Sequence, residues 1–277
     1  MATSFLKDTL MKVLTESRTK DPVVLRNLLK EYFQVVVLDF IYAHPVYSQL
    51  FFYGGSCLAH CYGLPRLSED LDFVDMKSEI DLGVLAQDIT IFMYKEAGCN
   101  IKATRQKFRV HLKIPILREL GLATASESDV LFLKVEIFRD SGLLASSKPE
   151  YIPLFIRNRS IIITTFDLPT LMSTKIRAVL LRTWKRTNKK GETVATVKGR
   201  DYFDLMWYLE RGIKPNLTYL PEAKNLEDLK KQLHSALDRA DAKSIRLDLE
   251  AFLEDKIYME KVSHTIKSIL SSQIDAL

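Results

Sequence analysis

The chain has 277 residues, of which 47% are hydrophobic and 27% are charged. These proportions are typical of a folded globular protein and exclude an intrinsically disordered chain, which would need fewer apolar residues and a larger net charge. The formal charge of +5 is compatible with a nucleic-acid partner without identifying one. Three cysteines do not make a disulfide framework, and neither a signal segment nor an apolar run of about 18 residues is visible. We therefore expect a cytoplasmic protein with no membrane partner.

The first part of the chain is expected to be helical and then to enter a sheet. Residues 1–45 carry apolar side chains at helical spacing, and Asp21-Pro22 is a favourable start for a helix. The apolar run Leu50–Tyr53 predicts a buried strand that stops at a glycine turn, Gly54-Gly55-Ser56. Residues 57–62 then suit a short helix, because a glycine and a proline follow them.

The middle of the chain is expected to supply the rest of a sheet, and the last third to be helical. Apolar alternation predicts strands over residues 71–74, 108–114 and 130–138, with a helix over 84–97. Helical patterns follow over residues 168–187 and 198–211 and again after Pro221. We predict an α/β (α+β) fold in which a lobe with a mixed sheet, residues 1–165, precedes a helical lobe, residues 166–277.

A strand that breaks into glycines and a helix forms a potential phosphate-binding site. The N–H groups at the start of a helix have no partners within the helix, and the helix dipole favours anions there. Gly55 would let a phosphate approach the backbone closely, and Ser56 adds a hydroxyl group at the same place. We expect both residues to bind a nucleotide.

Asp70 and Asp72 form the second part of the predicted site. Residues two apart on a strand point to the same face, so the two carboxylates would stand side by side while Leu71 and Phe73 anchor the other face. Adjacent carboxylates repel each other unless a cation neutralises them. Mg²⁺ suits this arrangement, because it takes a few carboxylate oxygens together with substrate phosphate oxygens. The pair therefore predicts metal-assisted phosphoryl transfer.

Other residues offer alternative or additional sites. Cys57, His60 and Cys61 would share a helical face, so a zinc site can be imagined, although small cysteines in a helix are common core residues. Two basic segments could meet RNA, although charge runs are usually only solvated surface. One is the loop 183–191, which we favour because it joins two further motifs, and the other is the strand face Lys107, Arg109, His111 and Lys113.

The glycine–serine turn, followed after residues 57–69 by Asp70-Leu71-Asp72, resembles the signature of the DNA polymerase β-like nucleotidyltransferase superfamily. The resemblance implies a third metal-binding carboxylate on a later strand. Glu136 is the candidate, because apolar residues flank it as the pattern requires. A polar residue on a half-exposed strand would give the same pattern, so that alternative stays open.

Two downstream motifs make the resemblance closer. Lys175 to Arg182 fits a Lys-x-x-Ala-x-x-x-Arg helix, and Lys198 to Asp204 fits a Lys-x-Arg-Asp-x-x-Asp helix start. Together with the first two motifs, in the same order, they resemble the AbiEii/AbiGii toxin family, which includes the MenT nucleotidyltransferases. The resemblance covers roughly residues 50 to 212.

The resemblance implies roles for residues in these two motifs. It makes Asp70, Asp72, Lys175 and Asp201 functional, with Lys175 as a cation for triphosphate oxygens. Asp201 could act as a base or orient a cation, and Arg200 could bind nucleotide phosphates or pair with carboxylates. Asp204 and Arg182 are expected to support the same helix faces.

The implied activity is that of a toxin in a toxin–antitoxin pair. Such an enzyme would use Mg²⁺ to transfer nucleotides from a nucleoside triphosphate to RNA, with the 3′ acceptor end of tRNA as the expected target and an antitoxin as protein partner. Two alternatives remain: nucleotidylation or phosphorylation of a protein, such as the antitoxin, and a non-catalytic binding module.

Overall fold

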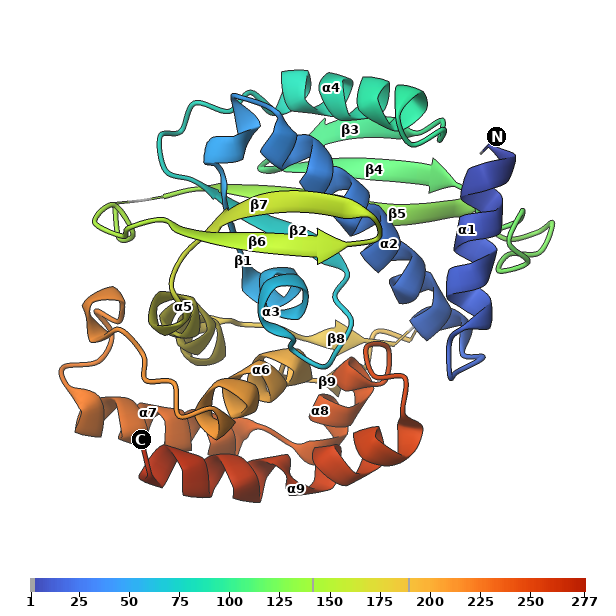
Figure 1. The fold of residues 1–277 in the computed structure, drawn as a ribbon. Helices are drawn as coiled ribbons and strands as arrows, with labels where there is room; N and C mark the ends of the chain where they lie inside the picture. The colour runs from blue at the N-terminus through green and yellow to red at the C-terminus, as the bar shows by residue number, and fades with distance from the viewer. Residues whose placement is uncertain (1–2, 141, 189) are drawn as a thin grey trace. The chain divides into compact units, whose positions relative to one another are not determined.

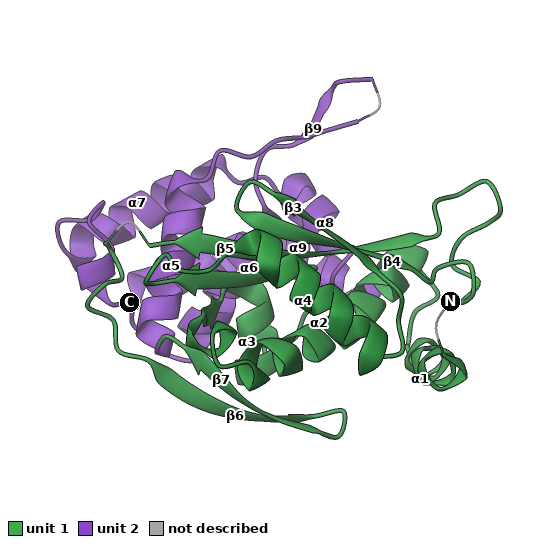
Figure 2. Cartoon of the chain, turned by 90° about the horizontal axis from the view of Figure 1, so that it is seen from above, with its two compact units in different colours: residues 1–166 green, residues 167–277 purple. Residues whose placement is uncertain are grey.

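The computed structural model describes residues 3–140, 142–188 and 190–277 (Figure 1). Over this part the chain divides into two compact units, residues 1–166 and residues 167–277, which Figure 2 shows in green and purple. The first unit combines helices with a mixed sheet, and the second is mainly helical. No helix in the described ranges is both long enough and apolar enough to span a membrane.

Three of the four α-helices described in the first unit begin after a residue whose side chain caps them. The helices of this unit are α1 (Ser4–Thr15), α2 (Pro22–Ala43), the 3₁₀ helix η1 (Tyr47–Gln49), α3 (Gly54–Tyr62) and α4 (Leu82–Lys95). Asp21 caps α2, as predicted, by accepting a hydrogen bond from the backbone N–H of Val23. Gly63 ends α3 in the left-handed conformation with a φ of 73°.

The sheet of the first unit has the order β3-β4-β5-β2-β1-β7-β6. Its strands are β1 (Phe51–Tyr53), β2 (Asp70–Asp75), β3 (Lys102–Gln106), β4 (Arg109–Pro115), β5 (Val130–Arg139), β6 (Glu150–Ile156) and β7 (Arg159–Thr165). The pairs β2–β5 and β1–β7 are parallel, and the other neighbours are antiparallel. The sheet is therefore mixed, as predicted.

One face of the central strands is buried, and the opposite face carries the predicted carboxylates. Leu71 and Phe73 of β2 are fully buried, as are Leu133 and Val135 of β5. These are the apolar faces that alternation predicts. Helix α2, which contacts β2, β5 and β7, covers this core with its own buried side chains, among them Leu29, Phe33 and Val37.

Three strands of the first unit have no counterpart in the sequence prediction. Strand β3 alternates weakly and is largely exposed. Strand β6 contains Pro153, which cannot donate a ladder hydrogen bond and is tolerated because β6 is at the edge of the sheet. Its hairpin to β7 turns at Arg157 and Asn158, which have positive φ angles of 51° and 59°. Because neither residue is a glycine, the sequence does not mark this turn.

The second unit packs its helices around α6. It contains α5 (Leu168–Leu181), the strands β8 (Arg186–Thr187) and β9 (Thr193–Ala195), α6 (Gly199–Glu210), the 3₁₀ helix η2 (Leu217–Tyr219), α7 (Leu226–Arg239), α8 (Ala242–Leu249) and α9 (Lys256–Asp275). Helix α6 contacts α5, α8 and α9. The predicted end of the helix over residues 168–187 was wrong, because α5 ends at Leu181 and the chain then forms a hairpin of β8 and β9.

Candidate functional site

Helix α3 begins at Gly54, immediately after β1, so the glycine turn predicted before the helix is the helix's own first turn. Gly54 has a φ of 78°, which favours glycine, and this conformation lets the chain pass from strand to helix with no linker. The N-cap residue, Tyr53, makes no capping hydrogen bond through its side chain. The first N–H groups of α3 thus remain without acceptors inside the helix, which is the property that an anion-binding helix start requires.

Gly54 lies directly against one of the predicted carboxylates. Strand β1 pairs with β2 so that Tyr53 is opposite Asp72. A Cβ atom on residue 54 would be 2.6 Å from Asp72 Oδ2, which is closer than such atoms approach. The absence of a side chain at Gly54 therefore allows the start of α3 and the Asp72 carboxylate to converge.

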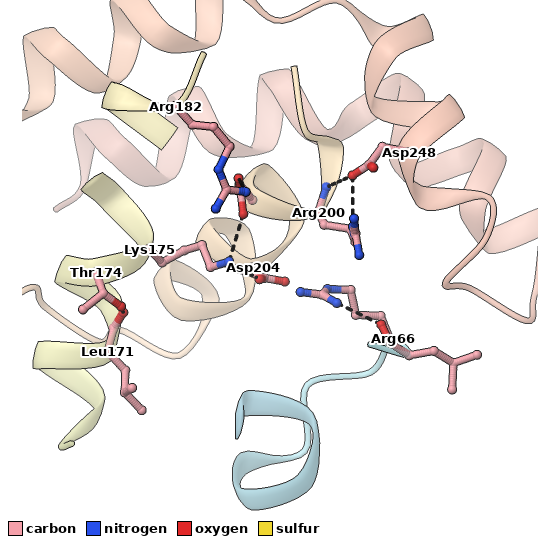
Figure 3. Close-up of polar contacts among 10 residues, drawn as sticks. Arg66, Leu171, Thr174, Lys175, Arg182, Arg200, Asp204 and Asp248 are labelled. Atoms are coloured by element: carbon pink, nitrogen blue, oxygen red, sulfur yellow. Dashed lines mark hydrogen bonds and ion pairs between the residues drawn. The ribbon is translucent and has the colours of Figure 1, made fainter. Parts of the chain in front are cut away.

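Gly55 leaves room for the buried guanidinium group of Arg66. A Cβ atom on residue 55 would clash with Nη2 of Arg66, whose side chain is buried. Arg66 Nη1 donates a hydrogen bond to the Leu67 carbonyl oxygen at 2.8 Å, and Figure 3 shows this contact. A guanidinium group thus lies beside the first turn of α3, where it adds positive charge to the site that the helix dipole already favours for anions.

Ser56 is fully buried in this first turn. Its Oγ atom is shielded from solvent, and no hydrogen-bond partner for it occurs among the described residues. Burying a hydroxyl group without a partner costs free energy, so such a group indicates either strain or a ligand that completes it. The expected role of Ser56 in phosphate binding fits this second explanation.

The predicted carboxylates lie on one face of the sheet. In the parallel pairing of β2 with β5, Asp70 is opposite Lys134 and Asp72 is opposite Glu136. Because the side chains of register partners point to the same face, the structure places Asp70, Asp72 and Glu136 together on the face opposite the core. The local sequence predicts the faces of these strands but not the register that puts Glu136 beside Asp72.

Basic side chains accompany these carboxylates. Lys134 Nζ is 3.1 Å from Asp70 Oδ2, and Arg109 Nε is 3.2 Å from Glu136 Oε1. Burial raises the pKa of Asp70, and the negative charge of Glu69 raises it further, against the opposing effect of Lys134. An ionised Asp70 is therefore poorly solvated and would be stabilised by additional positive charge.

The oxygen donors fit Mg²⁺. Within the described ranges no three His, Cys, Asp or Glu side chains are grouped as a complete metal-binding set. Mg²⁺ does not need such a set, because it is commonly bound through one or two carboxylates plus substrate phosphates and water. Asp70 and Asp72 supply carboxylates of this kind beside a helix start that suits phosphate.

In the second unit, Lys175 pairs with two buried aspartates, Asp201 and Asp204, and Figure 3 shows it beside Asp204. Its Nζ atom is 2.9 Å from Asp201 Oδ1 and 2.8 Å from Asp204 Oδ2. Arg182 Nη1 binds the other oxygen of Asp201 at 2.6 Å. The spacing of these residues along α5 and α6 therefore assembles one network from the two downstream motifs, in which Asp204 pairs with Lys175.

The charge state of Asp201 distinguishes between the two roles that the sequence left open. Burial alone would raise the pKa of Asp201, but the positive charges of Lys175 and Arg182, together with the hydrogen bond from Lys175, lower it overall. A carboxylate with a lowered pKa is a weak proton acceptor. The arrangement favours a positioning role, in which Asp201 and Asp204 hold the Lys175 ammonium group in place.

Arg200 has partners of its own within the second unit. Its Nε atom is 3.3 Å from Asp248 Oδ2, its backbone N–H donates to the same oxygen at 2.9 Å, and its guanidinium carbon is 3.9 Å from the centre of the Phe252 ring. Figure 3 shows the two contacts with Asp248. These contacts tie α6 to α8, which is a structural role, and nucleotide binding by Arg200 stays a prediction.

The cysteine and histidine group has other contacts. Cys57 is buried, with its Sγ atom 3.3 Å from Thr165 Oγ1. His60 Nε2 is 3.0 Å from Gln34 Oε1, and burial, followed by the nearby charge of Arg157, lowers the pKa of His60 to about 4. These are the contacts expected of core residues.

The two basic segments are arranged differently from the sequence expectation. In the loop 183–191, Lys189 lies outside the described residues, and β8 forms part of a hairpin with β9. On the predicted strand face, Arg109 pairs with Glu136, whereas Lys107 precedes β4 in the turn from β3 and has a φ of 53°. Lys107 is therefore not on the strand face.

Two residues of the site were missed by sequence reasoning. Lys134 could have been found, because it is two residues before Glu136 on a strand and so shares its face. Arg66 has no such signal, since it lies in an irregular segment between α3 and β2 and reaches Gly55 only through the fold.

Comparison with known proteins relates this geometry to a family. The family described as "Nucleotidyl transferase AbiEii toxin, Type IV TA system" matches residues 38–276. No curated protein matches the chain.

Among solved structures, MenT4, the nucleotidyltransferase toxin Rv2826c from Mycobacterium tuberculosis H37Rv, is similar with a TM-score of 0.55 and 12% identity, over 98% of this chain and 90% of that one. JHP933 from Helicobacter pylori is similar with a TM-score of 0.50 and 18% identity, over 91% of this chain and 93% of that one. At these identities the similarity shows a shared fold, and it confirms the predicted nucleotidyltransferase fold of the polymerase β type.

Proposed function

The chain belongs to the AbiEii family of nucleotidyl transferase toxins of type IV toxin–antitoxin systems, and we propose that it transfers a nucleotide from a nucleoside triphosphate to RNA with the help of Mg²⁺. The expected acceptor is the 3′ end of tRNA. An antitoxin protein is the expected partner, and the cytoplasm is the expected compartment. The proposal names the acceptor and the metal, which family membership alone does not.

The convergence of Gly54 with Asp72 is the observation that carries this proposal. It brings a helix start, whose first N–H groups have no acceptors inside the helix, next to a row of carboxylates on β2 and β5. The first feature suits the phosphates of a triphosphate, and the second suits the cation that accompanies them. Few other ligands combine three linked phosphates with a bound Mg²⁺.

The residues of the chain would divide the work as follows. Asp70 and Asp72 would hold Mg²⁺, which when bound supplies positive charge to the phosphate oxygens. Ser56 and the first N–H groups of α3 would bind phosphate oxygens, with Arg66 adding charge nearby. In the second unit, Asp201 and Asp204 hold the Lys175 ammonium group, and its role as a cation for triphosphate oxygens stays a prediction.

The reaction needs no covalent intermediate with the protein. The terminal hydroxyl oxygen of the acceptor attacks the α-phosphorus, a new P–O bond forms, and the bond to the β-phosphate oxygen breaks. Pyrophosphate leaves, and the proton of the hydroxyl group passes to water. Catalysis in this account comes from positioning and charge stabilisation.

A labelling experiment tests the proposal. Purified protein is incubated with each α-³²P-labelled nucleoside triphosphate, Mg²⁺, total RNA and a candidate antitoxin, and the products are separated into RNA and protein. We expect label on the 3′ end of tRNA-sized RNA. Label on protein alone would show that the acceptor is a protein and not RNA. The absence of any label with all four triphosphates would contradict nucleotidyl transfer.

A further inference from the structure

A hollow in the first unit lies at one end of β2 and β5. Its volume is about 580 Å³. It is lined by side chains from the ends of these strands, from the β3–β4 turn and from the start of α4: Asp75, Ile80, Asp81, Leu82, Arg105, Lys107, Phe108, Ile137, Phe138 and Arg139. None of these residues belongs to the motifs that define the proposed catalytic site.

Aromatic rings connect this hollow with the carboxylate face. Phe138 is two residues beyond Glu136 on β5 and so points to the same side of the sheet. Its ring centre is 4.8 Å from that of Phe108 and 6.1 Å from that of Tyr53, the register partner of Asp72. Because a strand rises about 3.3 Å per residue, Asp75 at the hollow is about 10 Å along β2 from Asp72.

The hollow also carries a positive charge excess. Arg105, Lys107 and Arg139 line it, and all three are exposed. The two acidic residues in the lining accept hydrogen bonds from backbone N–H groups. Asp75 accepts hydrogen bonds from the N–H groups of Lys77 and Ile80, and Asp81 caps α4 by accepting from Gly83 and Val84. The basic groups therefore face solvent beside carboxylates that already accept hydrogen bonds from the backbone.

We propose that this hollow, formed by Arg105, Lys107, Phe108, Phe138 and Arg139, binds the single-stranded end of the acceptor RNA. This inference rests on the proposed function, and it specifies which surface holds the acceptor. Unpaired bases stack on aromatic rings, and basic side chains track the phosphate backbone, which is the combination that single-stranded nucleic-acid sites use. The rings of Phe108, Phe138 and Tyr53 would guide the RNA strand from the hollow toward Asp72, where the terminal hydroxyl group of the RNA would react.

The test compares two triple variants that remove the same charge. The hollow variant is Arg105→Ala, Lys107→Ala, Arg139→Ala. The control variant is Lys20→Ala, Lys95→Ala, Lys102→Ala, whose lysines are exposed in the same unit and do not line the hollow. For both, the Kd for a fluorescent single-stranded RNA is measured by anisotropy at several salt concentrations, alongside the KM for RNA and for the triphosphate in the transfer reaction.

We expect the hollow variant to weaken RNA binding by at least about tenfold, and to reduce the slope of log Kd against log salt by up to roughly 2, since each lost phosphate contact to a single strand removes about 0.7. Its KM for the triphosphate should stay within about twofold of the control. A third variant, Phe138→Leu, keeps an apolar side chain but removes the ring, and should weaken RNA binding by about tenfold with little effect on the salt slope.

The outcomes separate this inference from the proposed function. If the wild-type protein labels RNA while the hollow and control variants bind RNA equally well, the hollow is not the acceptor site and the proposed function stands. An increased KM for the triphosphate alone would assign the hollow to the nucleotide and overturn the inference. Failure of the wild-type protein to label RNA would instead overturn the proposed function.

Discussion

At the scale of single residues, the candidate site depends on the absence of two side chains and the presence of one hydroxyl group. Gly54 lets the start of α3 meet Asp72, and Gly55 leaves room for the Arg66 guanidinium group. Ser56 supplies a buried hydroxyl group for which the described residues offer no partner. All three residues belong to the first turn of one helix, so single substitutions there can test the site.

Gly54→Ala should lower both stability and activity. Alanine disfavours a φ of 78°, and its Cβ atom would be 2.6 Å from Asp72 Oδ2. The matched control is Gly63→Ala, at a φ of 73° but with open space around it. By urea unfolding we expect a loss of about 1 kcal/mol for the control and on the order of 3 kcal/mol for Gly54→Ala. Equal losses, with transfer activity intact in both, would show that the contact with Asp72 is not needed.

Ser56→Ala should leave stability nearly unchanged and weaken nucleotide binding. Because no described residue bonds to Ser56 Oγ, its removal should change the free energy of unfolding by less than about 0.5 kcal/mol. A lost hydrogen bond to a charged phosphate should raise the KM for the triphosphate roughly tenfold. Ser147→Ala, which removes another buried Oγ with no described partner, is the control. The same KM in both variants would exclude phosphate binding by Ser56.

Asp201→Asn should change how stability depends on pH. The pKa of Asp201 is lowered in the folded state, so its contribution is present above the unfolded value of about 3.9 and is lost as the pH falls through the folded value. Urea unfolding at pH 7 should show the variant to be less stable than the wild-type protein, with the difference shrinking below about pH 4. Asp238→Asn, at an exposed site on α7, is the matched control. A difference that is constant from pH 7 to pH 3 would contradict the ionised pair.

At the scale of elements, the second unit positions Lys175 by holding α5, α6 and α8 together. Asp201 and Asp204 on α6 bind Lys175 of α5, while Arg200 at the start of α6 binds Asp248 of α8. The Arg200 and Asp248 side chains are only 12% and 7% exposed, so solvent screens their interaction little. Arg200 thus fixes the start of the helix that carries both aspartates.

Arg200→Gln should therefore reduce stability more than nucleotide affinity. Removing one partner of a buried ion pair costs on the order of 3 kcal/mol, which thermal and urea unfolding would detect. Arg246→Gln, which breaks an ion pair with Glu260 whose side chains are 48% and 43% exposed, should cost less than about 1 kcal/mol. At a temperature where both variants are folded, the KM for the triphosphate should match the wild-type value. A tenfold higher KM with unchanged stability would instead support nucleotide binding by Arg200.

The sequence predicts the faces of the strands but not how the strands pair. The faces of β2 and β5 could be predicted because Leu71 and Phe73, or Leu133 and Val135, alternate with polar residues. The pairing of Asp72 with Glu136 could not, because the register of two strands distant in sequence leaves no local pattern. The end of α5 was missed for a similar reason: Leu181 is followed by a hairpin whose pairing, Arg186 with Ala195, depends on residues beyond the helical pattern.

At the scale of the whole molecule, the four sequence motifs are divided between the two units. The first unit supplies the helix start, the carboxylates and the hollow, and the second supplies the Lys175 network. The formal charge of +5 favours an anionic acceptor, although it does not select one. The order of the four motifs indicates such a division, whereas the contributions of Arg66 and Asp248 became evident only from the fold.

Incorporation of α-³²P-labelled nucleotide into RNA by Asp72→Asn, compared with the wild-type protein, tests the central claim most directly. Asparagine keeps the shape of the side chain but removes the negative charge that the proposed Mg²⁺ site requires beside the start of α3. We expect the variant to fold with an unchanged or higher melting temperature and to lose at least about a thousandfold in the rate of incorporation. Incorporation at more than about a tenth of the wild-type rate by the folded variant would contradict the account.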